Sequence, residues 1–189
     1  GNIAVLNIVS YDDWLMFVGK KTRNMIRKAE KNNVVITINP EKQSLIQGIY
    51  TIYNETPIRQ NRSFSHYGIT VKEVAQYLYN ASGVFVCAYI NNQLVGFIEL
   101  LRDKDTVDIS QILSLVSCRD KAINNVLVAG VVKYCVSVGV HWVVYARFGN
   151  HPSLDEFKFN NGFRVYHVDG YCGLKDRVPN FVKYPLIPV

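Results

Sequence analysis

Apolar and polar residues alternate along the chain in blocks whose spacing predicts strands and helices in turn. Residues 3–9, IAVLNIV, form an apolar run rich in β-branched side chains, which is typical of a strand. Between residues 12 and 32, apolar residues return with the period of an α-helix and collect on one side. The other side carries a basic stripe made of Lys20, Arg23, Arg27 and Lys31. The pattern predicts one amphipathic helix, whose basic stripe either binds a polyanion or faces water.

Shorter blocks continue the alternation. An Asn-Pro pair ends the β-branched run VVITI, and Thr70 and Glu73 have the spacing of a capping box at the start of a helix. The predicted elements in this part are a strand at 34–38, a helix at 41–53, a long loop at 55–68 and a helix at 70–81.

Three apolar runs then follow closely on one another. They are joined by an Asn-Asn pair and by the polar stretch RDKDT, both short enough for turns between antiparallel strands. Helical and strand-like patterns alternate afterwards, and glycines end the helices. The predicted elements are strands at 84–90, 94–101 and 107–116, a helix at 121–138, a strand at 142–146, a helix at 152–160, and strands at 163–168 and 181–186.

The predicted order is β-α-α-β-β-β-α-β-α-β-β, preceded by a strand and the basic helix. An antiparallel meander followed by β-α-β units predicts an α/β (α+β) fold with a mixed central sheet and helices on both faces. Ligands in such sheets bind where neighbouring strands diverge, here the strands at 107–116 and 142–146. We expect two parts. Residues 1–33 would form an arm, either on its own account or as the remnant of a preceding domain, and residues 34–189 would form the main domain.

The composition narrows the class of protein. With 49% hydrophobic and 19% charged residues, the chain is typical of globular rather than disordered proteins. The net charge of +6 favours an anionic partner such as a nucleotide phosphate, a nucleic acid or a membrane surface. The four cysteines are too far apart for a zinc motif, and no apolar run is long enough to span a bilayer. We therefore expect a cytoplasmic protein without a metal.

Three phrases carry a resemblance to a known family: TRNMIRKAEKNNV at 22–34, YNETPIRQNRSFSHYG at 53–68 and FKFNNGF at 157–163. They resemble the Fem-type branch of the GNAT superfamily of N-acyltransferases, whose best-known members attach amino acids to peptidoglycan precursors from aminoacyl-tRNA. The element order is similar to the GNAT fold over residues 34–189. The resemblance implies transfer of an acyl group from acyl-CoA or aminoacyl-tRNA to an amine on a small molecule or peptide.

The resemblance also implies a donor site. In CoA-dependent members, a (Gln/Arg)-x-x-Gly-x-(Gly/Ala) loop holds the pyrophosphate with backbone N–H groups and a helix N-terminus. Arg119 fits this pattern, but Ala122 and Asn124 fill the two glycine positions. Such a loop either binds a donor other than acetyl-CoA or merely starts a helix. The candidate donor-binding residues are Ser114, Leu115, Val116, Ser117, Arg119, Ala122, Asn124 and Asn125.

Amide formation needs a base for the amine and a group that assists departure of the leaving group. The candidate bases are Asp108 and Glu99, although each of them is equally suited to pairing with an arginine. Many GNAT enzymes use a tyrosine as the acid at the position of Lys158, and the Fem-type resemblance implies that this lysine stabilises negative charge instead. Tyr145 is the other candidate acid, unless it packs in the core.

The loop at 55–68 is the candidate acceptor site. Two arginines with a histidine and aromatic residues are suited to gripping a carboxylate or phosphate, and long loops in compact domains often serve a function. The candidate residues are Arg59, Gln60, Arg62, His66 and Tyr67.

Two further hypotheses remain open. The chain is either a GNAT-like binding module without chemistry, as one half of a two-domain Fem-type protein would be, or it binds tRNA or another nucleic acid through the basic helix. The second hypothesis is compatible with an aminoacyl-tRNA donor.

Overall fold

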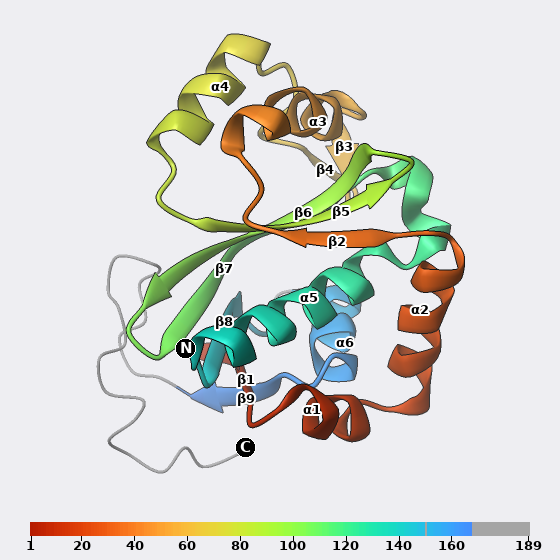
Figure 1. Ribbon diagram of the computed structural model, residues 1–189, viewed down its shortest axis with the longest axis vertical. Helices are drawn as coiled ribbons and strands as arrows, with labels where there is room; N and C mark the ends of the chain where they lie inside the picture. The colour runs from red at the N-terminus through yellow and green to blue at the C-terminus, as the bar shows by residue number, and fades with distance from the viewer. Residues whose placement is uncertain (150, 168–189) are drawn as a thin grey trace.

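The computed structural model describes residues 1–149 and 151–167 of the chain. A seven-stranded mixed sheet runs through the middle of the molecule, with strand order β2-β5-β6-β7-β8-β1-β9. Helices α3 and α4 cover one side of the sheet, and α5 crosses the other side with α1, α2 and α6 around it (Figure 1). The predicted α/β fold with helices on both faces is confirmed.

The sheet strands are β1 (Asn2–Asn7), β2 (Val35–Ile38), β5 (Val84–Ile90), β6 (Gln93–Asp103), β7 (Thr106–Ser114), β8 (Trp142–Arg147) and β9 (Arg164–His167). The helices are α1 (Tyr11–Phe17), α2 (Lys20–Lys31), α3 (Lys42–Asn54), α4 (Val71–Asn80), α5 (Ile123–Val138) and α6 (Pro152–Asn160), with a 3-10 helix η1 (Val116–Lys121) before α5. The strand predicted at 181–186 lies outside the described residues.

The single helix predicted at 12–32 is wrong, because the structure has two helices there. Val18 leaves the helical conformation with ψ 139°, and Gly19 is extended with ψ 167°. Arg23 then donates from one guanidinium nitrogen to the carbonyl oxygens of Leu15, Met16 and Val18, which would otherwise have no partner at the end of α1. The helical period continues across the break because the buried side chains of Trp14, Val18 and Ile26 all face the core.

The long loop predicted at 55–68 contains a small hairpin of its own. Strands β3 (Ile58–Arg59) and β4 (Arg62–Ser63) pair antiparallel around Gln60 and Asn61. Both turn residues have positive φ, 52° and 59°. A type I′ turn requires this conformation at its two central residues, which explains the hairpin without a glycine.

Local signals in the sequence identify several element ends correctly. The capping box of α4 forms between Thr70 and Glu73, and Gly139 ends α5 in the left-handed conformation with φ 67°. Asn91 and Asn92 form the left-handed turn between β5 and β6. These predictions are confirmed because each depends on the chemistry of neighbouring residues alone.

Residues 1–33, the predicted arm, share the sheet and core with the rest of the described chain. Strand β1 lies between β8 and β9 and pairs antiparallel with both. Helix α2 packs against α5, and Thr22, Ile26 and Ala29 are buried. The boundary at residue 33 stays a prediction.

Among the described strands, β7 and β8 are the one parallel pair, and they separate after a short distance. Their register runs from Thr106 with Trp142 to Asp108 with Val144. Strand β7 continues to Ser114 beside β6, and β8 continues to Arg147 beside β1. The divergence predicted from the sequence is therefore present and marks the candidate site. None of the helices in the described residues is long and apolar enough to cross a membrane.

Candidate functional site

Lys158 lies buried beside the diverging end of β8. Only 1% of this residue is exposed, and its Nζ donates a 2.6 Å hydrogen bond to the carbonyl oxygen of Arg147 at the end of that strand. The same nitrogen lies 4.6 Å from the centre of the Tyr145 ring. Burial lowers the pKa of Lys158, although Asp155 acts in the opposite direction. A buried ammonium held by neutral groups can stabilise a nearby anion strongly, because little water screens it.

Tyr145 and Asp108, the other candidates on the parallel pair, have different surroundings. Tyr145 is 7% exposed, packs edge-on against Phe163, and has its pKa raised by burial. Asp108 lies at the last position where β7 and β8 still pair. Both residues therefore border the place where the strands separate.

Glu99 points toward α3 and α4 and is held by neutral side chains. Its Oε2 accepts hydrogen bonds from the Tyr77 hydroxyl at 2.7 Å and from Gln111 Nε2 at 3.3 Å. Gln111 also donates to Tyr77 and accepts from Tyr53. Glu99 is 5% exposed and makes no ion pair with another described residue. A buried carboxylate without a cation is costly to keep, which is why such groups are often functional.

The phenols around Glu99 remain protonated near neutral pH. Burial raises the pKa of Tyr77, and the hydrogen bond to Glu99 and its charge raise it further. Burial also raises the pKa of Tyr53 to about 12. Both phenols therefore act as hydrogen-bond donors. Tyr77 donates to Glu99 on β6, and Tyr53 donates to Gln111 on the part of β7 that no longer pairs with β8.

The turn after β7 contains the predicted donor-binding residues Ser114–Ser117. Arg59 donates to the carbonyl oxygen of Ser114 at 2.8 Å. The backbone N–H groups of Val116 and Ser117 donate to the Glu55 carboxylate at 2.5 and 2.9 Å. Leu115 donates to Val95 of β6 at 2.8 Å. The N–H groups expected to face a donor are therefore engaged by the protein itself in this turn.

The N-terminus of α5 has the properties of an anion site. Ala122 adopts the left-handed conformation with φ 55°, so that the chain turns sharply into the helix. No side chain caps α5, whose first N–H groups carry a partial positive charge. Arg119 is exposed just before the helix, and Asn124 Oδ1 is buried without a hydrogen-bond partner among the described residues.

A hollow of about 240 Å³ opens beside this helix end. Side chains of α2, α5 and α6 line it, among them Lys21, Met25, Asn125, Ser153 and Phe157. Lys21 and Glu156 form an exposed ion pair at 3.1 Å across α2 and α6. The hollow thus lies between the helix N-terminus of the predicted donor loop and the helix that carries Lys158.

The five candidate acceptor residues divide into two groups. Gln60, Arg62 and Tyr67 are exposed on and after the hairpin. His66 is half-buried and stacks on Tyr53 with ring centres 4.4 Å apart, and burial lowers its pKa. Arg59 is turned inward and held by carbonyl oxygens, so it belongs to the turn after β7 as much as to the loop.

Sequence reasoning missed Glu55, Tyr53, Tyr77 and Gln111. Tyr53 is only the last residue of the helix predicted at 41–53, and Glu55 stands just beyond that predicted helix. Apart from the Glu55–Arg59 ion pair, which joins residues four positions apart, the side-chain hydrogen bonds of these four residues join residues 12 to 62 positions apart, a separation that no local pattern reports.

Comparison with known proteins bears on the family and the fold. The sequence profile of the acetyltransferase (GNAT) family matches residues 46–163. No curated protein matches the chain by sequence. In the described residues, no group of three or more His, Cys, Asp and Glu side chains is arranged to hold a metal.

Several solved structures share the fold. The FemX structure is 11% identical, with a TM-score of 0.68 over 87% of this chain and 59% of that one. The structure of L-PGS from Bacillus licheniformis is 14% identical, with a TM-score of 0.56 over 79% of this chain and 46% of that one. The PaiA N-acetyltransferase of Thermoplasma acidophilum, in complex with coenzyme A, is 16% identical, with a TM-score of 0.51 over 72% and 94%. The chain therefore spans about half of the FemX and L-PGS structures.

Proposed function

Because this chain belongs to the acetyltransferase (GNAT) family, we propose that it transfers an acyl group from acyl-CoA to an amine acceptor. The observation that carries the proposal is the buried Lys158 at the diverging end of β8, on α6, the helix that borders the hollow beside α5. A cation in this place would lie beside a carbonyl oxygen that becomes negative during acyl transfer.

The residues around the start of α5 fit the phosphates of coenzyme A. The uncapped helix N-terminus supplies N–H groups and a favourable dipole, and Arg119 adds a positive charge. The hollow beside Asn125 and Phe157 would receive the adjoining part of the donor. The PaiA complex with coenzyme A supports such a donor for a chain of this fold.

In the proposed reaction, the acceptor nitrogen attacks the donor carbonyl carbon. The new C–N bond forms, the C–S bond of the thioester breaks, and the electron pair leaves with sulfur. Glu99, on the α3 and α4 side of the sheet, would take the proton that the amine loses, directly or through water, and Lys158, on the α6 side, would stabilise the oxygen while it is negative. The two groups would therefore act from opposite sides of the opening between β7 and β8. The thiolate then takes up a proton from solvent. Gln60, Arg62, His66 and Tyr67 would contact the acceptor.

Titration of the protein with coenzyme A tests the donor, and thiol release from acyl-CoA tests the reaction. We expect saturable binding, and one thiol released for each amide formed with a panel of primary amines. Binding without thiol release from any acceptor would instead favour a binding module that has lost its chemistry. Absence of binding would contradict the acyl-CoA proposal.

Aminoacyl-tRNA is the second candidate donor, because α2 presents a basic surface. Arg27, Lys28 and Lys31 are exposed, and none of them forms an ion pair with a described residue. The Fem-type phrases of the sequence favour the same donor. The ester bond to the tRNA would then break in place of the thioester, in the cytoplasm, where tRNA is charged.

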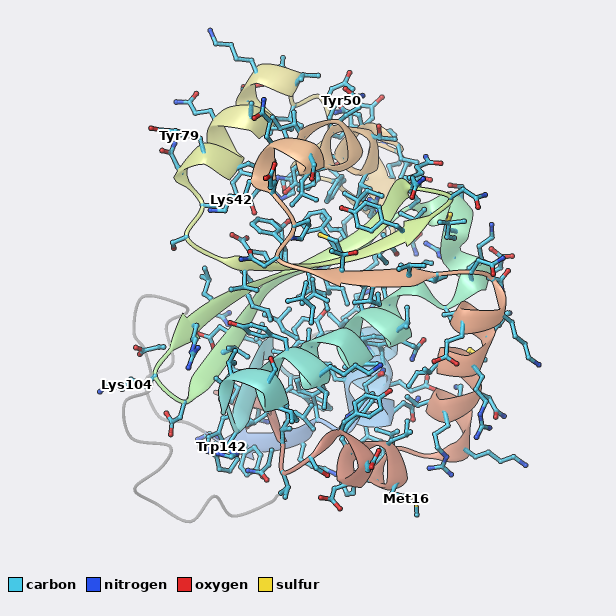
Figure 2. The ribbon with its side chains drawn as sticks, in the orientation of Figure 1. Met16, Lys42, Tyr50, Tyr79, Lys104 and Trp142 are labelled. Carbon is cyan, nitrogen blue, oxygen red and sulfur yellow. The ribbon has the colours of Figure 1, made fainter. Side chains whose placement is uncertain are left out.

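The test uses the triple variant Arg27→Gln, Lys28→Gln, Lys31→Gln. When the logarithm of the tRNA association constant is plotted against the logarithm of the salt concentration, we expect the slope to be smaller in magnitude by about one for each phosphate contact that the variant loses. Filter binding between 50 and 200 mM salt would measure the slope. Arg23 is left in place because it holds the end of α1. The control is Lys72→Gln with Lys104→Gln, since Lys104 projects from the β6–β7 turn on the side away from α2 (Figure 2). Equal slopes in both variants would rule out α2 as the tRNA surface.

A further inference from the structure

We propose that Glu55 and Arg59 are positioning residues that hold the turn after β7 in the shape that receives the acyl donor. The inference rests on the proposed function, because residues 114–117 border the same site. Neither residue would touch the reacting atoms. Their role would be to fix backbone groups that border the opening between β7 and β8.

The contacts of the two side chains converge on one short segment. Glu55 accepts from Val116 N at 2.5 Å with Oε2 and from Ser117 N at 2.9 Å with Oε1. Arg59 donates from one terminal nitrogen to the carbonyl oxygen of Ser114 at 2.8 Å. The two side chains together therefore hydrogen-bond two backbone N–H groups and one backbone carbonyl oxygen within residues 114–117. This arrangement leaves the turn little freedom to rotate.

The pair is itself held firmly on the side of α3. The second terminal nitrogen of Arg59 donates to the carbonyl oxygen of Ile52 at 2.8 Å and pairs with Glu55 Oε2 at 3.3 Å. The guanidinium lies 4.8 Å from the centre of the Phe64 ring. The side chains of Glu55 and Arg59 are only 18% and 14% exposed. Because water is largely excluded, these charge-assisted bonds are stronger than those of a surface pair.

The position of the turn explains why it needs such support. Strand β7 does not pair with β8 beyond Asp108, so within residues 1–149 and 151–167 its last residues have a sheet neighbour only in β6. An end with one neighbour is prone to local opening. The pair ties this end to α3 and to the hairpin of the predicted acceptor loop. A displacement of the predicted acceptor loop would therefore also displace residues 114–117, because Glu55 and Arg59 connect the two segments.

The charge of Glu55 should make the turn sensitive to acid. Burial alone would raise the pKa of Glu55, but the N–H groups of Ser117 and Val116, the Ser117 hydroxyl and Arg59 together lower it. Two further charged groups are placed near the pair: Arg119 of η1, which acts on Arg59, and Arg62, which stands opposite Arg59 in the hairpin. A lowered pKa means that the bonds to the turn are complete above the pKa of a free glutamate. They are lost as the pH falls through the lower pKa of the folded protein.

Amide NMR of the whole chain tests the contact directly. In the unmodified protein, we expect the amide protons of Val116 and Ser117 to shift together on acidification, with one midpoint below about 4.3, the value of a free glutamate. In Glu55→Gln, this shift should disappear, and hydrogen exchange of the two amides should become about 10- to 100-fold faster. A lysine cannot reproduce the two separate guanidinium hydrogen bonds to the carbonyl oxygens of Ser114 and Ile52. Arg59→Lys should therefore also accelerate hydrogen exchange at Val116 and Ser117. The control is Glu41→Gln, an exposed glutamate at the other end of α3.

Coenzyme A binding then separates this inference from the proposed function. We expect Glu55→Gln to weaken coenzyme A binding about tenfold or more, and Glu41→Gln to leave it unchanged. Unchanged exchange at Val116 and Ser117, or faster exchange with unaltered coenzyme A affinity, would overturn the positioning role while the proposed function stands. If exchange at Val116 and Ser117 became faster in Glu55→Gln but even the unmodified protein bound no coenzyme A, Glu55 would still fix the turn, and acyl-CoA would be excluded as the donor.

Discussion

Lys158→Met is expected to lower the turnover number of acyl transfer by about 100- to 1000-fold, the usual effect of removing one group that stabilises a developing oxyanion. The Nζ atom lies in a dry environment, with the Arg147 carbonyl oxygen and the Tyr145 ring as its neighbours. Its charge is therefore little screened and acts strongly on an adjacent negative oxygen. Methionine keeps the length of the side chain and removes the charge.

The same variant should keep its stability, which separates a catalytic role from a structural one. A buried charge without a close opposite charge costs free energy in the folded state, and replacement by an apolar side chain of similar volume is often neutral or stabilising. Turnover at saturating donor and the free energy of unfolding in urea would be measured side by side. Lys133→Met, on the exposed side of α5, is the matched control. Full activity in Lys158→Met, or a collapse of stability that accounts for lost activity, would disprove the catalytic role.

The pH dependence provides a second readout for Lys158. Because burial lowers its pKa below the usual 10.5, the ammonium loses its proton earlier on the alkaline side than a surface lysine does. Turnover should therefore decline before pH 10.5 in the unmodified protein. The unfolded chain holds the proton more tightly, so this group favours folding increasingly as the pH rises from the lowered pKa toward 10.5. Both trends should be missing in Lys158→Met.

Glu99→Gln is expected to lower kcat/KM at neutral pH by about 100-fold or more, the usual contribution of a positioned general base. Glutamine preserves the shape of the side chain, and its amide oxygen still accepts from Tyr77. We therefore expect the free energy of unfolding to change by less than about 1.5 kcal/mol, the worth of an ordinary hydrogen bond. Initial rates over a range of amine concentrations would give kcat/KM.

Asp108→Asn is the matched comparison, since Asp108 is the other carboxylate suggested by the sequence. It lies in the paired part of β7, whereas Glu99 stands opposite Gln111 in the part that has separated from β8. We expect the larger loss in Glu99→Gln. A larger loss in Asp108→Asn would transfer the role of base to that residue. If both variants kept the activity of the unmodified protein, neither carboxylate would be the base.

The sequence predicts the fold well where local chemistry decides. The capping box at Thr70, the turn at Asn91 and Asn92, and the end of α5 at Gly139 each follow from a few adjacent residues. The break at Val18 and Gly19 could not be predicted, because the apolar period passes through it unchanged. It depends on Arg23 reaching back to the end of α1.

The candidate site shows the same division. The place where the strands separate follows from element order, and Lys158 follows from a resemblance in the phrase FKFNNGF. The surroundings of Lys158, and the neutral partners of Glu99, depend on contacts between distant segments. The proposed role of Glu55 is the clearest case, since the two backbone N–H groups that it accepts from lie 61 and 62 residues further along the chain.

The place of β1 in the sheet has a consequence for how the chain folds. Strand β1 precedes the other described strands in the sequence, yet both of its neighbours come from the other end of the described residues, with Ile3 opposite Arg147 on one side and Tyr166 on the other. Bringing such distant segments together costs loop-closure entropy before any contact repays it, and folds rich in such pairings form slowly. We therefore expect the segments around the candidate site to reach their final arrangement late in folding, when β1 inserts between β8 and β9.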